Sequence, residues 1–273
     1  MSGDLVALVT GATSGIGAAA VRSLHDKGFI VYGAGRRLDR LNALAGDRVF
    51  PLELDVTDAE SREAAIARII AEQGRIDVLV NNAGYGAQGA IEDTALDDAR
   101  RQLEVNVLGP MGLVQLVLPH MRSQKSGRII NITSVGGKIY SLLGGWYHGS
   151  KFALEALSDC LRLETAPFGI HVSVIEPGAI ATEWGSIAAD NVERVSGEGA
   201  YQRDAAAVAK SLRAMNASGS GSPAKVVADA IAEAAIASNP KTRYAIGKNA
   251  KLILFIRRML SDRRYDAFTR RSA

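Results

Sequence analysis

The sequence predicts a single α/β domain built on a doubly wound parallel sheet of about seven strands. Short runs rich in Val, Ile and Leu alternate with amphipathic helical stretches, and most of these runs lack the strict polar alternation of half-exposed strands. Such runs are typical of parallel strands that helices cover on both faces. The expected strands are residues 5–9, 30–33, 49–54, 78–81, 128–132, 171–175 and, as the weakest run, 243–246.

The length and the lack of linkers favour one domain. The chain has 273 residues, of which 47% are hydrophobic, and no Pro/Ser-rich segment divides it. We expect the domain to span residues 1–247. Within it, residues 179–222 break the rhythm with small residues and are expected to form a lid over the substrate. Residues 248–273, which follow the domain, are expected to form a basic amphipathic extension.

Charge is concentrated at the end of the chain. Residues 251–273 hold seven Lys and Arg against Asp262 and Asp266, so this tail carries +5 and leaves the first 250 residues at −2. A slightly negative body without an interleaved basic and aromatic stripe predicts no nucleic-acid binding. We also assign no metal site.

Cysteine use and apolar runs indicate a cytoplasmic protein. Cys160 is the single cysteine, so no internal disulfide forms, and its apolar neighbours predict a buried thiol. The N-terminus lacks the basic segment of a signal peptide, and no run approaches the roughly 20 apolar residues of a membrane span.

A glycine-rich loop joins the first strand to the first helix. In this context the backbone amides and the helix N-terminus hold a pyrophosphate, with Ser14 as a cap or phosphate contact, although a merely tight turn is the alternative. The expected phosphate-loop residues are Gly11, Thr13, Ser14, Gly15, Ile16 and Gly17.

Arg36 and Arg37 follow the second strand, where a protein selective for NAD usually places an acidic residue. Paired guanidinium groups bind a 2′-phosphate bidentately, so we expect NADP(H) as the cofactor. The alternative is an ordinary solvated helix start, but the helix dipole disfavours cations there unless an anion is present.

Tyr147 and Lys151 lie four positions apart and therefore share one face of a helix. An ammonium beside a phenol favours the phenolate and lowers a pKa that is ordinarily about 10. Ser134, at the end of the fifth strand, can donate a second hydrogen bond to the same substrate oxygen. This set predicts proton exchange with a carbonyl or alcohol. His148 points in another direction and is expected to be a bystander.

Taken in order, the motifs resemble those of the short-chain dehydrogenase/reductase family over residues 5–182. The resemblance implies a Rossmann-type domain, usually dimeric or tetrameric, that transfers a hydride to or from nicotinamide. The motifs are Thr10-Gly11-x-x-x-Gly15-x-Gly17, Asn81-Asn82-Ala83-Gly84, Asn106, Ser134, Tyr147-x-x-x-Lys151 and Pro177-Gly178.

The resemblance also implies individual roles. Asn106, Ser134, Tyr147 and Lys151 would form a catalytic tetrad in which Asn106 interrupts its helix and holds a water that relays protons to Lys151. Lys151 and Tyr147 would also contact the ribose beside the nicotinamide. The remaining cofactor contacts would be Asp55 and Val56 at the adenine, Asn82, Ala83 and Gly84 at the adenosine, and Pro177, Gly178 and Thr182 at the nicotinamide.

The residues expected to contact substrate, besides Ser134, are largely apolar, although any of them is as consistent with core or subunit packing. They are Tyr140, Leu142, Trp146 and Trp184. They favour a bulky apolar ketone or secondary alcohol. The expected activity is that of an NADP-dependent oxidoreductase acting on CH–OH groups. The alternatives are a cofactor-sensing binding protein without turnover and an epimerase or dehydratase on the same scaffold.

The tail resembles longer members of the family, related to hydroxysteroid and retinol dehydrogenases. Its run Leu252–Ile256, followed by Arg257 and Arg258, has three possible roles: lying on an anionic membrane, folding over the substrate entrance or contacting another subunit. Membrane contact is the least expected, because five apolar residues supply little depth. A homodimer or homotetramer is the default expectation.

Overall fold

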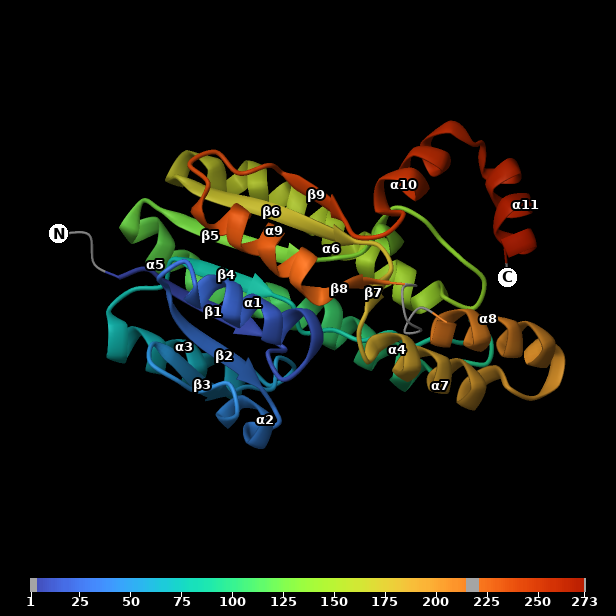
Figure 1. Cartoon of the computed structure of the whole chain (residues 1–273), viewed down its shortest axis with the longest axis horizontal. Coiled ribbons are helices and arrows are strands. Elements are labelled where there is room, and N and C mark those ends of the chain that lie inside the picture. Colours follow the sequence, from blue (N-terminus) through green and yellow to red (C-terminus); the bar gives the residue numbers. More distant parts are fainter. Residues whose placement is uncertain (1–3, 215–220, 273) are drawn as a thin grey trace.

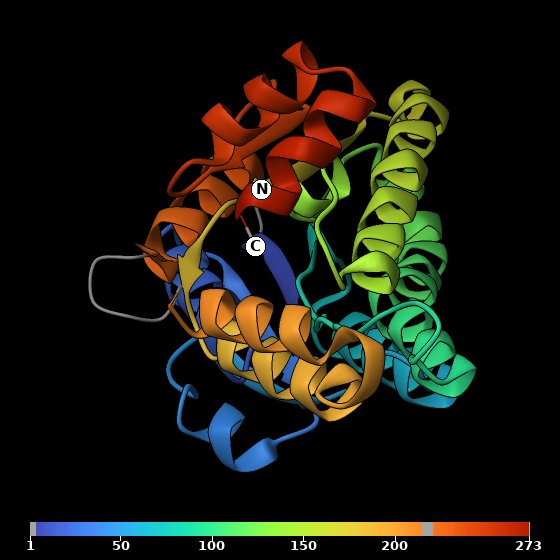
Figure 2. The same ribbon diagram turned by 90° about the vertical axis from the view of Figure 1, so that its right-hand side faces the viewer.

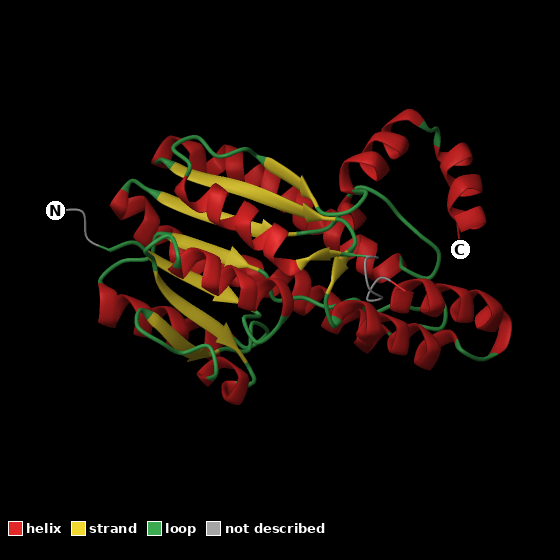
Figure 3. Ribbon diagram, viewed as in Figure 1, coloured by secondary structure: helices red, strands yellow, loops and turns green. Residues whose placement is uncertain are grey.

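A computed structural model describes residues 4–214 and 221–272. Seven strands form one parallel sheet in the order β3-β2-β1-β4-β5-β6-β9, which confirms the predicted fold class (Figure 3). Strand order reverses between β1 and β4, and ligands bind at such a switch point in doubly wound sheets. The strands are β1 Val6–Thr10, β2 Ile30–Gly35, β3 Val49–Glu53, β4 Val78–Asn81, β5 Gly127–Ile132, β6 Ile170–Pro177 and β9 Arg243–Ile246.

Helices cover both faces of the sheet (Figure 1). Leu24 and Ile231 lie in the core under α1 and α9, whereas Ile66, Leu113 and Leu161 lie in the core under α3, α5 and α6. Burial on both faces explains the continuous apolar runs of the central strands. The helices around the sheet, with α2 and α4 included, have the following bounds: α1 Gly15–His25, α2 Leu38–Asn42, α3 Ala59–Gln73, α4 Leu96–Leu103, α5 Gly109–Gln124, α6 Gly145–Thr165 and α9 Ala224–Ile236.

The segment expected to form a lid folds into a helical pair, α7 Trp184–Ser196 and α8 Gln202–Ala214, flanked by two short strands, β7 Ile180–Ala181 and β8 Ser222–Pro223, that pair with each other. Residues 215–220 of the predicted lid lie outside the described residues. The small side chains that mark this segment in the sequence let the helices approach closely. The core of the pair includes Ala189, Val192, Ala205 and Ala209, with Leu143 beside them.

The C-terminal extension forms two helices, α10 Ala250–Met259 and α11 Asp262–Ser272. Figure 2, which looks onto the carboxyl ends of the strands, places them on one side of that edge and α7 and α8 on the other. Within the described ranges, no helix has both the length and the apolar character needed to cross a bilayer.

The prediction that Cys160 is buried is wrong. Its side chain is exposed on α6. The helix turns Leu154, Ser158 and Leu161 toward the sheet, and position 160 therefore falls on the outer face.

Candidate active site

The glycine-rich loop is shaped by close backbone contacts at the carboxyl end of β1. Gly11 has a φ of 66°, in the left-handed region that favours glycine. A Cβ at Gly17 would overlap the carbonyl oxygen of Gly11. Asn82, just after β4, donates from Nδ2 to the carbonyl oxygen of Thr10 at 2.8 Å. The loop therefore needs glycine at both positions and is held in place by the neighbouring strand.

The rim of this loop fits a phosphate group. Ser14 is the N-cap residue of α1, yet its side chain makes no capping hydrogen bond, and the first turn of α1 carries no acidic residue. The helix N-terminus thus presents amide donors and a positive dipole end. Thr182 lies over the loop, since a Cβ at Gly15 would come 3.2 Å from the Thr182 methyl carbon. Predicted phosphate and nicotinamide residues are therefore neighbours.

Arg36 and Arg37 lie beside this rim and are exposed. The Arg37 guanidinium donates to the Thr13 hydroxyl at 2.7 Å, which ties the end of β2 to the glycine-rich loop. Asp55, after β3, accepts hydrogen bonds from the Thr57 amide at 2.9 Å and the Thr57 hydroxyl at 2.7 Å. Although burial opposes it, these bonds and nearby arginines, Arg36 among them, hold the pKa of Asp55 below its usual value.

The remaining residues expected at the adenosine follow the same edge. Val56 is buried directly after Asp55. The Ala83 amide donates to the Thr10 hydroxyl at 3.0 Å. On the far side of the switch point, the Gly178 amide donates to the carbonyl oxygen of Ile246 at 2.8 Å, which fixes the turn after Pro177.

Ser134, Tyr147 and Lys151 converge from two elements. Ser134 follows β5 by two residues, and its Oγ accepts from the Gly136 amide at 3.0 Å and donates to the carbonyl oxygen of Pro177 at 3.4 Å. The phenol of Tyr147 is buried, and its interaction with Ser134 favours the phenolate. One helical turn later, the ammonium of Lys151 donates to the carbonyl oxygen of Ile132 at 2.9 Å.

The electrostatics of this trio differ from the expectation. Burial raises the pKa of Tyr147 to about 12, and the bond with Ser134 only partly offsets this. Burial also lowers the pKa of Lys151 to about 8, with the charge of Glu155 acting in the opposite direction. The predicted lowering of the Tyr147 pKa is therefore not seen, because desolvation of the phenolate outweighs the other interactions.

Asn106 lies in a π-helical turn, Glu104–Leu108, that interrupts the run from α4 to α5. Its side chain accepts from the Tyr85 amide at 3.1 Å and donates to the Tyr85 carbonyl oxygen at 3.0 Å. A Cβ on Gly84 would lie 3.1 Å from the Asn106 oxygen and 3.7 Å from the Lys151 nitrogen. Asn106 and Lys151 thus approach the same small space, and a side chain at position 84 would crowd the Asn106 oxygen.

A sequence model described as short chain dehydrogenase matches residues 5–192, a range that contains every predicted catalytic and cofactor residue. The chain belongs to the short-chain dehydrogenase/reductase family. It is therefore an oxidoreductase of a family that binds nicotinamide cofactors and acts on small molecules.

Two relatives of this short-chain dehydrogenase/reductase agree with that assignment. The chain is 35% identical to the probable short-chain type dehydrogenase/reductase VdlC of Helicobacter pylori, over 97% of this chain and 96% of the relative. It is 41% identical over 177 residues to the 3-ketodihydrosphingosine reductase of Bacteroides thetaiotaomicron, covering 65% of this chain and 64% of that one.

Solved structures share the fold. A short-chain dehydrogenase from Streptomyces avermitilis has 37% identity and a TM-score of 0.79, over 93% of this chain and 92% of that chain. A serine dehydrogenase complexed with NADP+ has 25% identity and a TM-score of 0.78, over 89% of this chain and 95% of that chain. A 3-ketoacyl-(acyl-carrier-protein) reductase from Brucella melitensis, with 27% identity and a TM-score of 0.64, over 67% of this chain and 78% of that chain, was solved with NADH.

The side chains expected to contact substrate divide into two groups. The Trp184 ring lies 5.1 Å from the Tyr147 ring, centre to centre, so this lid residue does reach the predicted proton donor. Leu142 packs against the core of α7 and α8, and Trp146 is half-buried one residue before Tyr147. Tyr140 instead turns toward the C-terminal helices, where its hydroxyl donates to Asp266 at 2.9 Å. The structure therefore does not bring Tyr140 together with the others.

His148 braces the loop between Ser134 and Tyr147. Its Nδ1 lies 2.9 Å from the Gly136 carbonyl oxygen, and its Nε2 lies 2.9 Å from the Ser141 hydroxyl. Because a carbonyl oxygen only accepts, Nδ1 carries the proton and Nε2 accepts from Ser141. Burial lowers the pKa of His148 and keeps the ring neutral.

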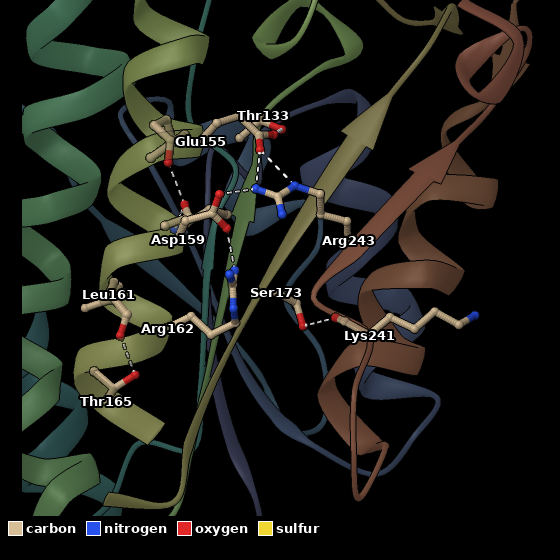
Figure 4. Close-up of polar contacts among 12 residues, drawn as sticks. Thr133, Glu155, Asp159, Leu161, Arg162, Thr165, Ser173, Lys241 and Arg243 are labelled. Atoms are coloured by element: carbon tan, nitrogen blue, oxygen red, sulfur yellow. Dashed lines mark hydrogen bonds and ion pairs between the residues drawn. The ribbon is translucent and has the colours of Figure 1, made fainter. Parts of the chain in front are cut away.

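A buried charge cluster behind the site was not predicted from the sequence (Figure 4). Glu155, one turn after Lys151, accepts from the Thr133 hydroxyl at 2.7 Å, from Lys138 at 3.0 Å and from Arg243 at 3.0 Å. Glu176, which precedes Pro177, lies 3.4 Å from Arg243. The cluster joins β5, α6, β6 and β9 beneath the trio, but its partners are distant in sequence, and only the four-residue spacing from Lys151 hints at Glu155.

The stability of this short-chain dehydrogenase/reductase is expected to depend on the protonation of Glu176. Burial and the charge of Glu155 raise the pKa of Glu176 from 4.5 to about 7. Folding therefore takes up a proton, and this contribution is complete below pH 4.5 and is lost as the pH rises through about 7. Above about pH 7, the unfolding free energy is therefore lower by about 3 kcal/mol than it is below pH 4.5.

We expect Glu176→Gln to raise the unfolding free energy near pH 8 by about 1–3 kcal/mol, because a neutral amide removes the buried charge and its repulsion by Glu155. Urea denaturation across a pH series measures this, and the slope between about pH 5 and 7 should flatten. Glu233→Gln, at an exposed carboxylate paired with Lys241, is the matched control. Equal slopes for wild type and Glu176→Gln would contradict the prediction.

Proposed function

We propose that this protein is an NADP(H)-dependent reductase or dehydrogenase that interconverts a bulky apolar ketone and its secondary alcohol. The observation that carries the proposal is the convergence of Ser134, Tyr147 and Lys151 at the carboxyl edge of the sheet, next to a loop that fits a dinucleotide phosphate. When bound there, the nicotinamide supplies or accepts the hydride at the substrate carbon.

Tyr147 is proposed as the general acid and base. Because its pKa is raised to about 12, the phenol is protonated at neutral pH and can donate its proton to a ketone oxygen. Ser134 would donate a second hydrogen bond to that oxygen and position it. The Lys151 ammonium, within one helical turn, would stabilise the negative charge that develops on the phenol oxygen.

The proton supply is proposed to pass through the space beside Gly84. Asn106 and Lys151 both border this space, and Ser150 accepts a hydrogen bond from Asn106 at 3.1 Å. A water held there would contact both side chains and could return a proton to Lys151 and then to Tyr147. The fixed geometry of Asn106 on Tyr85 supports this positioning role.

The preference for NADP(H) is proposed from charge. Arg36 and Arg37 lie after β2, at the place where a carboxylate would bind the 2′-hydroxyl of NAD. Two solved neighbours were crystallised with NADP and one with NADH, so relatives of this fold use either cofactor. The arginines are the feature of this chain that favours the phosphorylated form.

The apolar substrate class is proposed from the residues beside Tyr147. Trp184 covers the Tyr147 ring, and Leu142 and Leu143 pack with the lid helices. Such walls bind apolar groups and leave a charged substrate without partners. One relative is named a 3-ketodihydrosphingosine reductase, an enzyme named for a keto substrate.

A homodimer or homotetramer is proposed from the outer face of α6. Phe152, Leu157 and Leu163 are exposed there, and exposed apolar side chains of this kind support a subunit contact.

The absorbance of reduced nicotinamide tests this proposal. We expect NADPH consumption with aryl or long-chain ketones, and kcat/KM at least about tenfold lower for small charged ketones, whose carboxylate would be buried unpaired. Dinucleotide binding without turnover on any ketone or alcohol would favour the cofactor-sensing alternative. A product that retains its oxidation state would favour an epimerase or dehydratase.

A further inference from the structure

The C-terminal hairpin, defined as α10 and α11, has an inner face that is fixed to the body of the protein. Arg257 lies over the rings of Tyr140 and Tyr265, 5.5 and 5.1 Å from their centres, and bonds to Asp262 at 2.6 Å. Tyr265 is only 2% exposed, and Tyr140 also bonds to Asp266. These contacts fix the orientation of the hairpin, and they thereby determine which of its residues face outward.

The outer face of α10 carries a stripe of exposed apolar side chains. Leu252, Phe255 and Met259 are 56%, 60% and 65% exposed, and their spacing of three and four positions places them on one side of the helix. Nothing in residues 4–214 or 221–271 covers them. An apolar stripe of this kind on an otherwise polar surface marks a contact site.

The same hairpin exposes six cations. Lys251 and Arg258 are exposed on α10, and four more arginines are exposed on α11: Arg263, Arg264, Arg270 and Arg271. Among the described residues none of these six forms an ion pair with an acidic side chain. The two acids of the hairpin, Asp262 and Asp266, are engaged with Arg257 and Tyr140, so the hairpin exposes an apolar stripe together with six cations that have no acidic partner among the described residues.

We propose that the outer face of the C-terminal hairpin docks on an anionic phospholipid surface. A bilayer with acidic headgroups offers both negative charge and an apolar interior to an interfacial amphipathic helix, and each basic residue adds to the attraction. A second copy of the chain fits less well, because two hairpins face to face would bring six cations against six, and residues 1–250 carry a net charge of only −2.

This surface favours membrane contact over the two other roles of the tail. A run of five apolar residues supplies little depth, but an interfacial helix inserts only one side, and Met259 extends that apolar side beyond the run. The inner face meanwhile holds Tyr140, in the loop between Ser134 and Tyr147. Docking would thus place the loop that borders the proposed substrate site near the lipid, although docking itself does not depend on the proposed reaction.

Sedimentation of the full-length protein with vesicles tests the proposal. We expect binding to phosphatidylglycerol-containing vesicles to be at least about tenfold tighter than to pure phosphatidylcholine, and to weaken with added salt. Phe255→Ser and, separately, Arg263→Glu with Arg264→Glu should each weaken binding about tenfold or more. Ile236→Ser, at a residue of α9 that is 52% exposed, is the matched control and should bind as wild type does.

A second measurement reports the contact directly. Phe255→Trp should be quenched by brominated anionic lipid more strongly than Ile236→Trp, with wild-type emission from Trp146 and Trp184 subtracted. Wild-type protein that stays in the supernatant, or a Phe255→Ser variant that binds as tightly as wild type, would overturn the proposal. So would a concentration-dependent dimer that Phe255→Ser abolishes in the absence of vesicle binding, since the stripe would then belong to a second copy.

Discussion

Tyr147→Phe is expected to lower kcat for ketone reduction by about 10³-fold or more while dinucleotide affinity changes little. The variant removes only the hydroxyl that would give its proton to the substrate oxygen, and general acid catalysis contributes about 10²- to 10⁴-fold in enzymes. The ring stays, so its contact with Trp184 at 5.1 Å is kept. Single-turnover rates and titration of NADPH fluorescence measure the two quantities separately.

Tyr244→Phe is the control for that variant. Tyr244 is also buried, and its hydroxyl accepts from the Lys241 amide at 3.2 Å on the outermost strand, β9. Loss of this hydroxyl should cost some stability and leave kcat within a few-fold. If Tyr147→Phe turned over at the wild-type rate, Tyr147 could not be the proton donor and another group would have to be sought near Ser134.

The strands were predictable because a strand that is buried on both faces appears in the sequence as a continuous apolar run. Val78–Asn81 and Arg243–Ile246 coincide with their predicted ranges, and the other five agree to within a few residues. The two lid helices were missed because their amphipathic pattern is carried by alanines, such as Ala189 and Ala205, which add little to an apolar signal. Close helix packing gives those alanines their role.

Side-chain partners were less predictable than positions. The sequence places Tyr140 near the substrate, but its direction is decided by Arg257, Tyr265 and Asp266, more than a hundred residues away. The same limit applies to the charge cluster, in which Glu155 of α6 contacts Arg243 of β9, 88 residues away in the sequence. The pKa of Tyr147 depends on how deeply the phenol is buried, which no spacing along a helix reveals.

Arg36→Asp combined with Arg37→Ala is expected to change the ratio of kcat/KM for NADPH to that for NADH by about 10²- to 10⁴-fold in favour of NADH. A hydrogen bond to a charged group contributes about 1.5–3 kcal/mol, and the new carboxylate would both repel a 2′-phosphate and accept from a 2′-hydroxyl. Steady-state kinetics with both cofactors and one ketone measure the ratio.

Two comparisons separate charge recognition from damage to the glycine-rich loop. Arg36→Asp alone keeps the Arg37 bond to Thr13, so a change of ratio in this single variant must come from the charge at position 36. Loop distortion would instead weaken both cofactors equally and leave the ratio unchanged. Arg263→Asp with Arg264→Ala, a pair of exposed arginines on α11, should also leave it unchanged. An unaltered ratio in the Arg36 and Arg37 variant would mean that these arginines do not select the cofactor.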